Sequence, residues 1–161
     1  MEWLAHLRAN CMERTLAGLD WLAARRGREP ETAAHLATGI EGEDTAYFHL
    51  LRKGYLVVAR RWSAGNLPGD VDLIAWQGSL LCFIEVKTRS ARDMTPAEVA
   101  VDAHKRATLR RLAGQYVRQL PQETAPQVRF DVISVYLVAG KKDCVHFENA
   151  FGWTEGRRDW E

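Results

Sequence analysis

Cysteine is scarce in this sequence, and no two cysteines lie close together. Cys11, Cys82 and Cys144 are the only three among 161 residues, and none of them forms a C-x-x-C pair. An odd number of cysteines at such wide spacing argues against a disulfide framework and against a cysteine-rich zinc site. We therefore expect a reducing, cytoplasmic setting.

Long apolar runs are lacking as well. The first ten residues include Glu2, His6 and Arg8, whereas a secretory signal needs an uninterrupted apolar stretch. No apolar run elsewhere approaches the roughly 20 residues of a membrane-spanning helix. The sequence thus predicts a soluble protein without a membrane partner.

The third absence is an excess of charge of one sign. Twenty-two Lys and Arg residues stand against 21 Asp and Glu residues, which leaves a formal net charge of +1. A nearly neutral chain has no overall electrostatic attraction for a polyanion. Any surface that binds nucleic acid must therefore be local.

The first 37 residues carry the pattern of an amphipathic helix. Apolar residues recur at steps of three and four positions, with charged residues between them. They are Trp3, Leu4, Leu7, Cys11, Leu16, Leu19 and Leu22. Because such a stripe must be buried, we predict that residues 1–37 form a helical extension that docks on the remainder or pairs two copies into a homodimer.

A folded domain is predicted over residues 38–151, followed by a tail over residues 152–161. Thr38 and Glu41 have the spacing of a capping box, which predicts a helix from there to Gly54. Strands are predicted over 55–59, 71–76, 79–88, 130–138 and 145–151, and a basic helix over 101–120. This order of elements indicates an α/β or α+β sandwich with a mixed sheet.

Acidic residues gather on one predicted hairpin. If Gln77-Gly78 is its two-residue turn, Asp70 lies opposite Glu85, and Asp72 is the diagonal neighbour of Glu85 on the same face. Diagonal neighbours are about 7–8 Å apart between Cα atoms, so two carboxylates can converge on one cation. Lys87 points to the same face because side chains alternate along a strand.

Such crowding of carboxylates calls for a cation. Neighbouring carboxylates repel each other unless one is protonated or a metal ion is bound. Oxygen ligands without nearby histidine or cysteine favour Mg²⁺ or Mn²⁺. A divalent ion polarises a phosphoryl oxygen and lowers the pKa of a bound water, while Lys87 orients that water or stabilises charge on the phosphate. The pattern indicates phosphodiester hydrolysis.

The same residues also have a structural interpretation. In it, Asp72 ends a loop, and Glu85 pairs with Lys87 on an exposed edge of the sheet. Residues 80–84 argue against it, because they are apolar on both faces and predict a central strand. Charges at the end of a buried strand are costly unless they have a function. Lys87 is the only countercharge predicted on this face.

Further candidate residues surround this group. Glu43 falls on the apolar stripe of its helix and is a candidate acidic ligand, although a glutamate near a helix start is also stabilised by the helix dipole. Basic residues continuous with the site can follow a phosphate backbone or can simply be solvated. The candidates for nucleic-acid contacts are Lys105, Arg89, Arg106 and Arg61.

Short motifs from about Gly39 to Phe151 resemble, in order, those of the YraN family of predicted endonucleases. That family is similar to a branch of the PD-(D/E)XK nuclease superfamily. The motifs are Gly39-Ile40-Glu41-Gly42-Glu43, Gly54-Tyr55, Gly69-Asp70-Val71-Asp72-Leu73-Ile74-Ala75, Phe83-Ile84-Glu85-Val86-Lys87-Thr88-Arg89, Lys105 and Arg129-Phe130-Asp131-Val132.

The resemblance implies a fold and a set of roles. The fold is α/β, with a three-layer α/β/α restriction-endonuclease-like core and a mixed β-sheet. Asp72 would be the motif aspartate, Glu85 and Lys87 its E-x-K pair, and Glu43 the helix acid. The implied metal ligands are Asp72, Glu85 and the backbone carbonyl of Val86, with Glu43 and Asp70 as further candidates.

The sequence departs from the family's pattern at three places. Val71 stands where the superfamily has the proline of its name, and Asp70 stands where the family usually has glutamate. The extension before Gly39 is also longer than expected. The first two departures are mild, because the proline is often absent and Asp70 keeps the charge.

We expect a Mg²⁺- or Mn²⁺-dependent endonuclease that cuts branched or single-stranded DNA, in repair or recombination. Two alternatives remain at this point. The chain can be a DNA-binding module that does not cleave, or a protein-interaction factor of a DNA-processing complex. The acidic group and Lys87 favour the enzyme, because a binding module has no need to crowd carboxylates.

Overall fold

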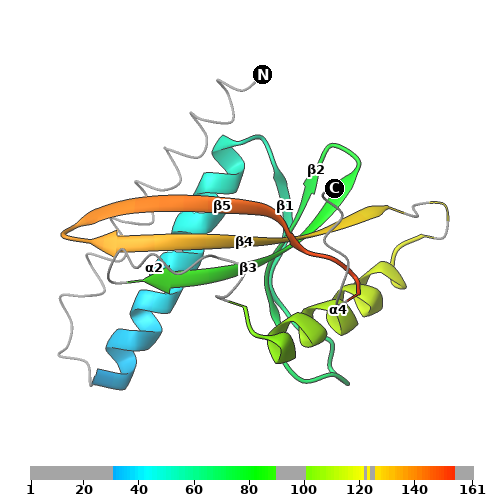
Figure 1. Ribbon diagram of the computed structural model, residues 1–161, viewed down its shortest axis with the longest axis horizontal. Coiled ribbons are helices and arrows are strands. Elements are labelled where there is room, and N and C mark those ends of the chain that lie inside the picture. The colour runs from blue at the N-terminus through cyan, green and yellow to red at the C-terminus, as the bar shows by residue number, and fades with distance from the viewer. Residues whose placement is uncertain (1–30, 90–100, 122, 124–125, 155–161) are drawn as a thin grey trace.

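The structure is a computed structural model, and it describes residues 31–89, 101–121, 123 and 126–154. Within these ranges the chain forms two helices, the first followed by three strands and the second by two (Figure 1). In chain order they are α2 (Glu31–Arg52), β1 (Leu56–Trp62), β2 (Val71–Gln77), β3 (Leu80–Arg89), α4 (Ala103–Val117), β4 (Gln127–Val138) and β5 (Lys141–Phe151).

The five strands form one mixed sheet whose order in space follows their order in sequence. β1 with β2, β2 with β3, and β4 with β5 are antiparallel, whereas β3 and β4 are parallel. A parallel pair needs a long crossover, and α4 lies in that connection. β3 is the middle strand, and its residues 81–85 are all buried, as its apolar sequence predicted.

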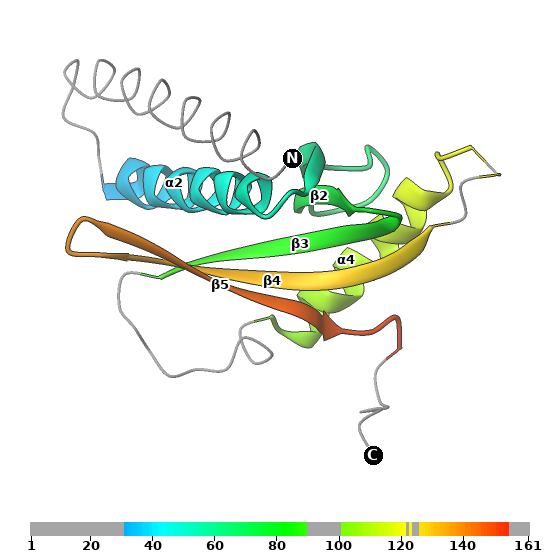
Figure 2. The ribbon, with the colours of Figure 1, turned by 90° about the horizontal axis from the view of Figure 1, so that it is seen from above.

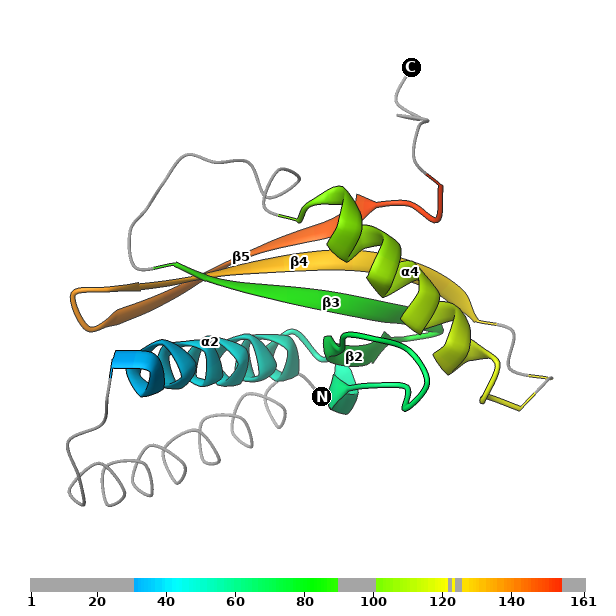
Figure 3. The ribbon, with the colours of Figure 1, turned by 90° about the horizontal axis from the view of Figure 1, so that it is seen from below.

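The helices cover opposite faces of the sheet, as Figures 2 and 3 show from two sides. The core beneath α2 consists of Ala46, Leu50, Tyr55, Leu73, Ala75, Cys82, Ile84, Ile133 and Val135. The core beneath α4 consists of Ala64, Val71, Ile74, Leu81, Phe83, Val101, Leu109, Leu112, Ala113, Phe130 and Val132. Two cores that share one sheet make three layers, so the predicted α/β/α architecture with a mixed sheet is confirmed.

The β2–β3 hairpin turns one residue later than predicted. Gln77 pairs with Leu80, so Gly78 and Ser79 are the central residues of the turn. Gly78 has φ +60°, and glycine at the first central position suits a type II′ turn. The prediction that Gln77-Gly78 forms the turn is therefore wrong, and every pair across the hairpin shifts by two residues.

The start of α2 also differs from the prediction. The helix begins at Glu31 and continues through Thr38, so Thr38 is not a helix cap. Thus α2 runs without a break across the predicted boundary between residues 37 and 38. Most of the predicted 1–37 extension lies outside the described residues, as do positions 155–161 of the tail. Neither described helix is long and apolar enough to cross a membrane.

Candidate active site

Asp72 and Glu85 meet where the start of β2 lies beside the middle of β3. The last pair assigned between these strands is Leu73 with Ile84, and one step further along the same register places Asp72 directly opposite Glu85. The amide of Val86 donates a hydrogen bond to Asp72 Oδ2 at 2.6 Å. The predicted diagonal arrangement is wrong, but a shift of two residues keeps both carboxylates on the same face.

Two lysines, and not one, neutralise Glu85. Its side chain is only 4% exposed, with Lys87 Nζ 2.9 Å from Oε1 and Lys105 Nζ 3.1 Å from Oε2. Lys105 Nζ also lies 3.3 Å from the backbone oxygen and 3.6 Å from Oδ1 of Asp70. The prediction that Lys87 is the only countercharge is therefore wrong.

Lys105 reaches the carboxylates because of where α4 begins. The side chain of Asp102 caps the helix by accepting a hydrogen bond from the Lys105 amide at 2.8 Å. This cap fixes the first turn of α4, and Lys105 extends from that turn toward the end of β3. The sequence placed Lys105 among nucleic-acid contacts, and its spacing gave no sign that it meets Glu85.

The electrostatics of this group are dominated by burial. Burial, and then the charge of Glu85, raise the pKa of Asp72 to about 7, although the hydrogen bond from Val86 and the charge of Lys105 act in the opposite direction. Burial lowers the pKa of Lys105, but the charges of Glu85 and Asp72 outweigh this effect and raise it overall. Asp72 is thus a carboxylate whose ionised form lacks a sufficient countercharge.

Glu43 lies near this group but does not join it. Its Oε2 is 2.5 Å from Nε of Arg61, on β1. The charge of Glu43 contributes to the raised pKa of Asp72, so the two carboxylates interact across space. The structure therefore places Glu43 beside the site, held by an arginine that sequence reasoning assigned to nucleic-acid contacts.

Gly42 sets how closely α2 approaches this end of the sheet. A Cβ at residue 42 would overlap Thr88 Oγ1 and lie 2.9 Å from Thr88 Cβ. Only a residue without a side chain lets α2 pack so tightly against β3. This contact holds Glu43, the next residue along α2, close to Asp72.

The candidate ligands suit a cation that needs few protein ligands. Glu85 Oε2 is buried and has no assigned hydrogen-bond partner among the described residues, although the Lys105 ammonium lies 3.1 Å from it. No group of three or more His, Cys, Asp or Glu side chains in the described ranges is arranged to hold a metal ion. Mg²⁺ commonly takes one or two carboxylates and completes its shell with water and phosphate oxygens. Asp72 and Glu85 meet that requirement.

The remaining predicted nucleic-acid contacts lie around the site. Arg89 is the last residue of β3 and is half-buried, and Arg106 follows Lys105 on α4. The Nε of Arg106 is buried and lacks a hydrogen-bond partner among the described residues. The structure thus brings Lys105 into the carboxylate group, and it places Arg89 on the same strand as Glu85 and Arg106 next to Lys105 on α4.

Comparison with known proteins places the chain in a family. The family model described as "Uncharacterised protein family UPF0102" matches residues 42–135, more than half of the chain. The chain belongs to the UPF0102 family. This agrees with the resemblance to the YraN family found in the sequence, and the UPF0102 match spans the site from Gly42 to Lys105.

Individual UPF0102 proteins match over most of their length. A UPF0102 protein of Koribacter versatilis is 46% identical over 123 residues, covering 76% of this chain and 85% of the relative. One of Solibacter usitatus is 43% identical over 130 residues, covering 79% and 94%. One of Porphyromonas gingivalis is 40% identical over 121 residues, covering 74% and 87%.

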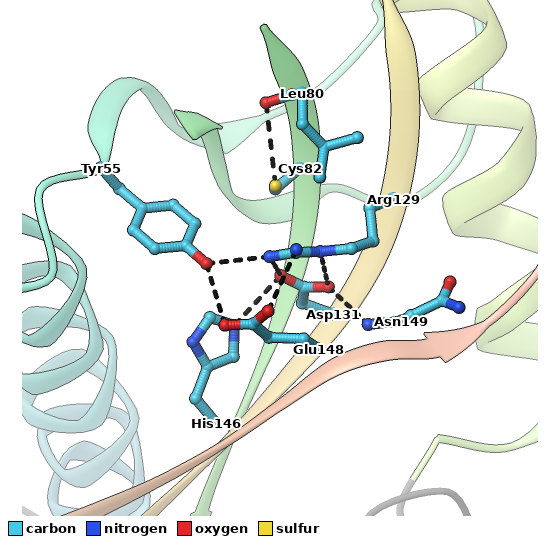
Figure 4. A network of polar contacts seen from close by, with 8 residues as sticks. All are labelled: Tyr55, Leu80, Cys82, Arg129, Asp131, His146, Glu148 and Asn149. Atoms are coloured by element: carbon cyan, nitrogen blue, oxygen red, sulfur yellow. Dashed lines mark hydrogen bonds and ion pairs between the residues drawn. The ribbon is translucent and has the colours of Figure 1, made fainter. Parts of the chain in front are cut away.

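A second polar group of this UPF0102 chain lies on the α2 face of the sheet (Figure 4). Arg129 Nε and a terminal nitrogen each bond one oxygen of Asp131 at 2.8 Å. Arg129 also donates to the Tyr55 hydroxyl at 2.8 Å and lies 3.1 Å from Glu148 Oε2. His146 Nε2 is 3.0 Å from Asp131 Oδ2, the oxygen that also accepts from the terminal nitrogen of Arg129. Together these contacts join β4 and β5 to Tyr55, which lies just after α2.

This second group is a paired network, unlike the first. Asp131 is fully buried, and burial raises its pKa, but hydrogen bonds from His146, Arg129 and the Asn149 amide outweigh burial and lower the pKa overall. These hydrogen bonds thus compensate the charge of Asp131 within the folded protein, which indicates a structural role. Sequence reasoning assigned no role to these residues. The alternation Arg129-x-Asp131, which puts both charges on one strand face, was the available signal.

Proposed function

We propose that this UPF0102 protein is a metal-dependent nuclease that hydrolyses phosphodiester bonds in DNA. The observation that carries the proposal is the pair of facing carboxylates, Asp72 at the start of β2 and Glu85 on the central strand β3. Glu85 is buried, and burial together with Glu85 raises the pKa of the opposing Asp72 to about 7. Such a pair costs free energy in the absence of a cation, and strongly perturbed carboxylates are typical of active sites.

The residues fit Mg²⁺ or Mn²⁺ better than zinc. Asp72 and Glu85 offer carboxylate oxygens, and the backbone carbonyl of Val86 is the third ligand we propose. Hard oxygen donors without histidine or cysteine favour Mg²⁺ and Mn²⁺. When bound, such an ion supplies a polarised phosphoryl oxygen and a water of lowered pKa.

The lysines complete the chemistry on the protein side. Hydrolysis forms a bond from a water oxygen to phosphorus and breaks the bond from phosphorus to a sugar oxygen. The water gives up a proton to solvent, the released sugar oxygen takes one up, and negative charge grows on the phosphate in between. Lys87, with 34% of its side chain exposed, is placed to donate to the attacking water or to the phosphate. Lys105 holds Glu85 and stabilises the same developing charge.

Membership of the PD-(D/E)XK superfamily is part of this proposal. Asp72 on β2 would supply its acidic residue, and Glu85 and Lys87 on the central strand β3 would supply its E-x-K pair. We propose DNA as the substrate, with Lys105, Arg106 and Arg89 as backbone contacts. A nearly neutral chain grips a long duplex poorly, which favours branched or single-stranded DNA.

The test incubates the full chain with single-stranded, duplex, flap and four-way DNA in Mg²⁺ or Mn²⁺. We expect cleavage of the branched or single-stranded substrates, complete loss of cleavage in chelator, and a loss of about 100-fold or more in Asp72→Asn and Glu85→Gln, because each removes a proposed ligand. Glu41→Gln is the matched control. Glu41 is an exposed acid that pairs with Lys142, away from the site.

Each result of this assay bears on a separate part of the proposal. Cleavage that persists in chelator would refute the metal requirement. Equal cutting of plain duplex would refute the substrate preference. DNA binding without cleavage in either metal would support the alternative of a non-catalytic binding module.

A further inference from the structure

Arg61 has an unusual backbone conformation beside the candidate site. It lies in β1, and the pairs Arg60 with Leu73 and Trp62 with Val71 place it opposite Asp72. Its φ is +47°, in the left-handed region that disfavours long side chains. Such a backbone conformation costs free energy, and residues that adopt it cluster at functional sites.

The side chain of Arg61 makes a close ion pair with Glu43. Nε of Arg61 is 2.5 Å from Glu43 Oε2, with the arginine side chain 46% exposed and the glutamate 18% exposed. The hydrogen bond that Arg61 donates to Glu43 raises the pKa of Arg61 above its ordinary value, with smaller contributions from the charges of Glu43, Asp44 and Asp72. Arg61 is thus the cation that satisfies Glu43 in the metal-free chain.

The neighbouring arginine provides a contrast. Arg60 pairs with Asp44 and lies 4.9 Å from the centre of the Tyr47 ring. Both partners of Arg60 belong to α2, so this clamp joins β1 to the helix. Glu43 differs from Asp44 because it also acts on Asp72, through the charge that raises the pKa of that residue.

We propose that Arg61 and the divalent ion compete for Glu43, and that the ion releases Arg61 to bind a phosphate of the nucleic acid. This inference rests on the proposed function. A cation held by Asp72 and Glu85 attracts the Glu43 carboxylate, which then leaves the guanidinium without its partner. A guanidinium presents parallel N–H donors that match two phosphate oxygens. Metal binding would thus create the phosphate contact at the moment when cleavage becomes possible.

The first experiment measures Mn²⁺ binding by calorimetry without nucleic acid, in the full chain and in Arg61→Gln, Glu43→Gln and the double variant. Loss of the competing arginine should tighten Mn²⁺ binding by about fivefold, the effect of one partly exposed ion pair. In the Glu43→Gln background the same change should have no effect. Arg60→Gln, which removes one charge from the next residue, should bind Mn²⁺ as the unchanged protein does.

The second experiment measures binding of single-stranded DNA in chelator and in Ca²⁺. Arg61→Gln should weaken binding by about fivefold in Ca²⁺ and by less than twofold in chelator, because the guanidinium is engaged by Glu43 until a cation arrives. Arg61→Gly repeats both experiments with a residue that adopts positive φ freely, so poor folding of the glutamine variant cannot hide the result.

The outcomes separate the two proposals. If the unchanged protein binds no Mn²⁺, Mg²⁺ or Ca²⁺, both the proposed metal dependence and the competition are wrong. Suppose instead that it binds Mn²⁺, but that Arg61→Gln and Arg61→Gly do not bind Mn²⁺ more tightly, or bind it more tightly by the same factor in the Glu43→Gln background. Then only the competition is wrong. If Arg61→Gln lost DNA affinity equally with and without Ca²⁺, Arg61 would contact DNA whether or not a cation is bound, and the proposed competition would also be wrong.

Discussion

At the scale of single residues, the candidate site contrasts with the buried network of Asp131. Both contain a buried carboxylate, but hydrogen bonds lower the pKa of Asp131, whereas burial and Glu85 raise the pKa of Asp72 to about 7. A carboxylate with a lowered pKa stabilises the fold when ionised, and one with a raised pKa destabilises it. The opposite directions of the two pKa shifts therefore distinguish a carboxylate that stabilises the fold from one that we propose has a functional role.

Asp72→Asn should therefore stabilise the metal-free protein, in a manner that depends on pH. A carboxyl group with a raised pKa contributes stability that is complete below its unfolded pKa, near 3.8, and is lost as pH rises through about 7. In chelator at pH 8 we expect the variant to be more stable by up to roughly 4 kcal/mol, the equivalent of a pKa shift from 3.8 to about 7. Near pH 4 the two proteins should be equally stable. Urea unfolding at both values of pH measures the difference.

The hydrogen bond from Val86 makes this a fair test, because an asparagine oxygen can accept it as the aspartate does. Glu41→Gln, an exposed substitution of the same kind, should show no such dependence on pH. A destabilised Asp72→Asn protein at pH 8 would mean that the ionised carboxylate supports the fold, and would contradict its role as a metal ligand.

At the scale of elements, the sequence predicted which segments form strands better than it predicted their register. The apolar run before Glu85 predicted a central strand because both of its faces are buried. The turn was misplaced because Gln77-Gly78 and Gly78-Ser79 both put glycine in a two-residue turn, and local residues do not decide between them. The predicted register was wrong by two residues. Because side chains alternate between the two faces of a sheet, a shift of two leaves each side chain on its predicted face, and the prediction that the carboxylates share one face still held.

Contacts between distant elements were beyond the reach of sequence patterns. Lys105 meets Glu85 because the cap at Asp102 starts α4 at the end of the sheet, and periodicity carries no information about that placement. The ion pair of Glu43 with Arg61 likewise depends on how α2 packs beside β1. A resemblance of motifs named the candidate residues of the site, but their pairing could be seen only in the fold.

The contact of α2 with β3 through Gly42 can be tested with a matched glycine. Both Gly39 and Gly42 lie inside α2, where alanine favours the helix by up to about 1 kcal/mol. A Cβ at Gly39 meets nothing within 4 Å, whereas one at Gly42 overlaps Thr88. We expect Gly39→Ala to raise stability by a few tenths of a kcal/mol or more, and Gly42→Ala to lower it by about 1–3 kcal/mol through overpacking.

Urea unfolding compares the two alanine variants, and the cleavage assay shows whether the shift of α2 reaches the site. Because Glu43 follows Gly42, displacement of the helix should also reduce cleavage in Gly42→Ala and leave it unchanged in Gly39→Ala. Equal stability of the two variants would show that Thr88 moves aside without cost and that this contact does not position α2.

At the scale of the whole molecule, the site and the neighbouring Glu43 together draw on all three layers. Asp72 and Glu85 come from the sheet, Lys105 from α4 on one face, and Glu43 from α2 on the other. A cation that binds only when these elements are assembled stabilises the folded state as a whole. Metal binding should therefore appear in global unfolding, and not only in the behaviour of a loop.

Thermal melting with and without Mg²⁺ measures this coupling. At a Mg²⁺ concentration about 100 times its Kd, linkage adds about 2.7 kcal/mol to the stability of the folded state. For a domain of this size that raises Tm by roughly 5–11 °C. Glu85→Gln should lose the increase because it removes the buried carboxylate to which both lysines are paired, and Glu41→Gln should keep it. If Mg²⁺ raises the Tm of Glu85→Gln as much as that of the unchanged protein, the ion binds elsewhere, and Glu85 has only its two lysines as partners.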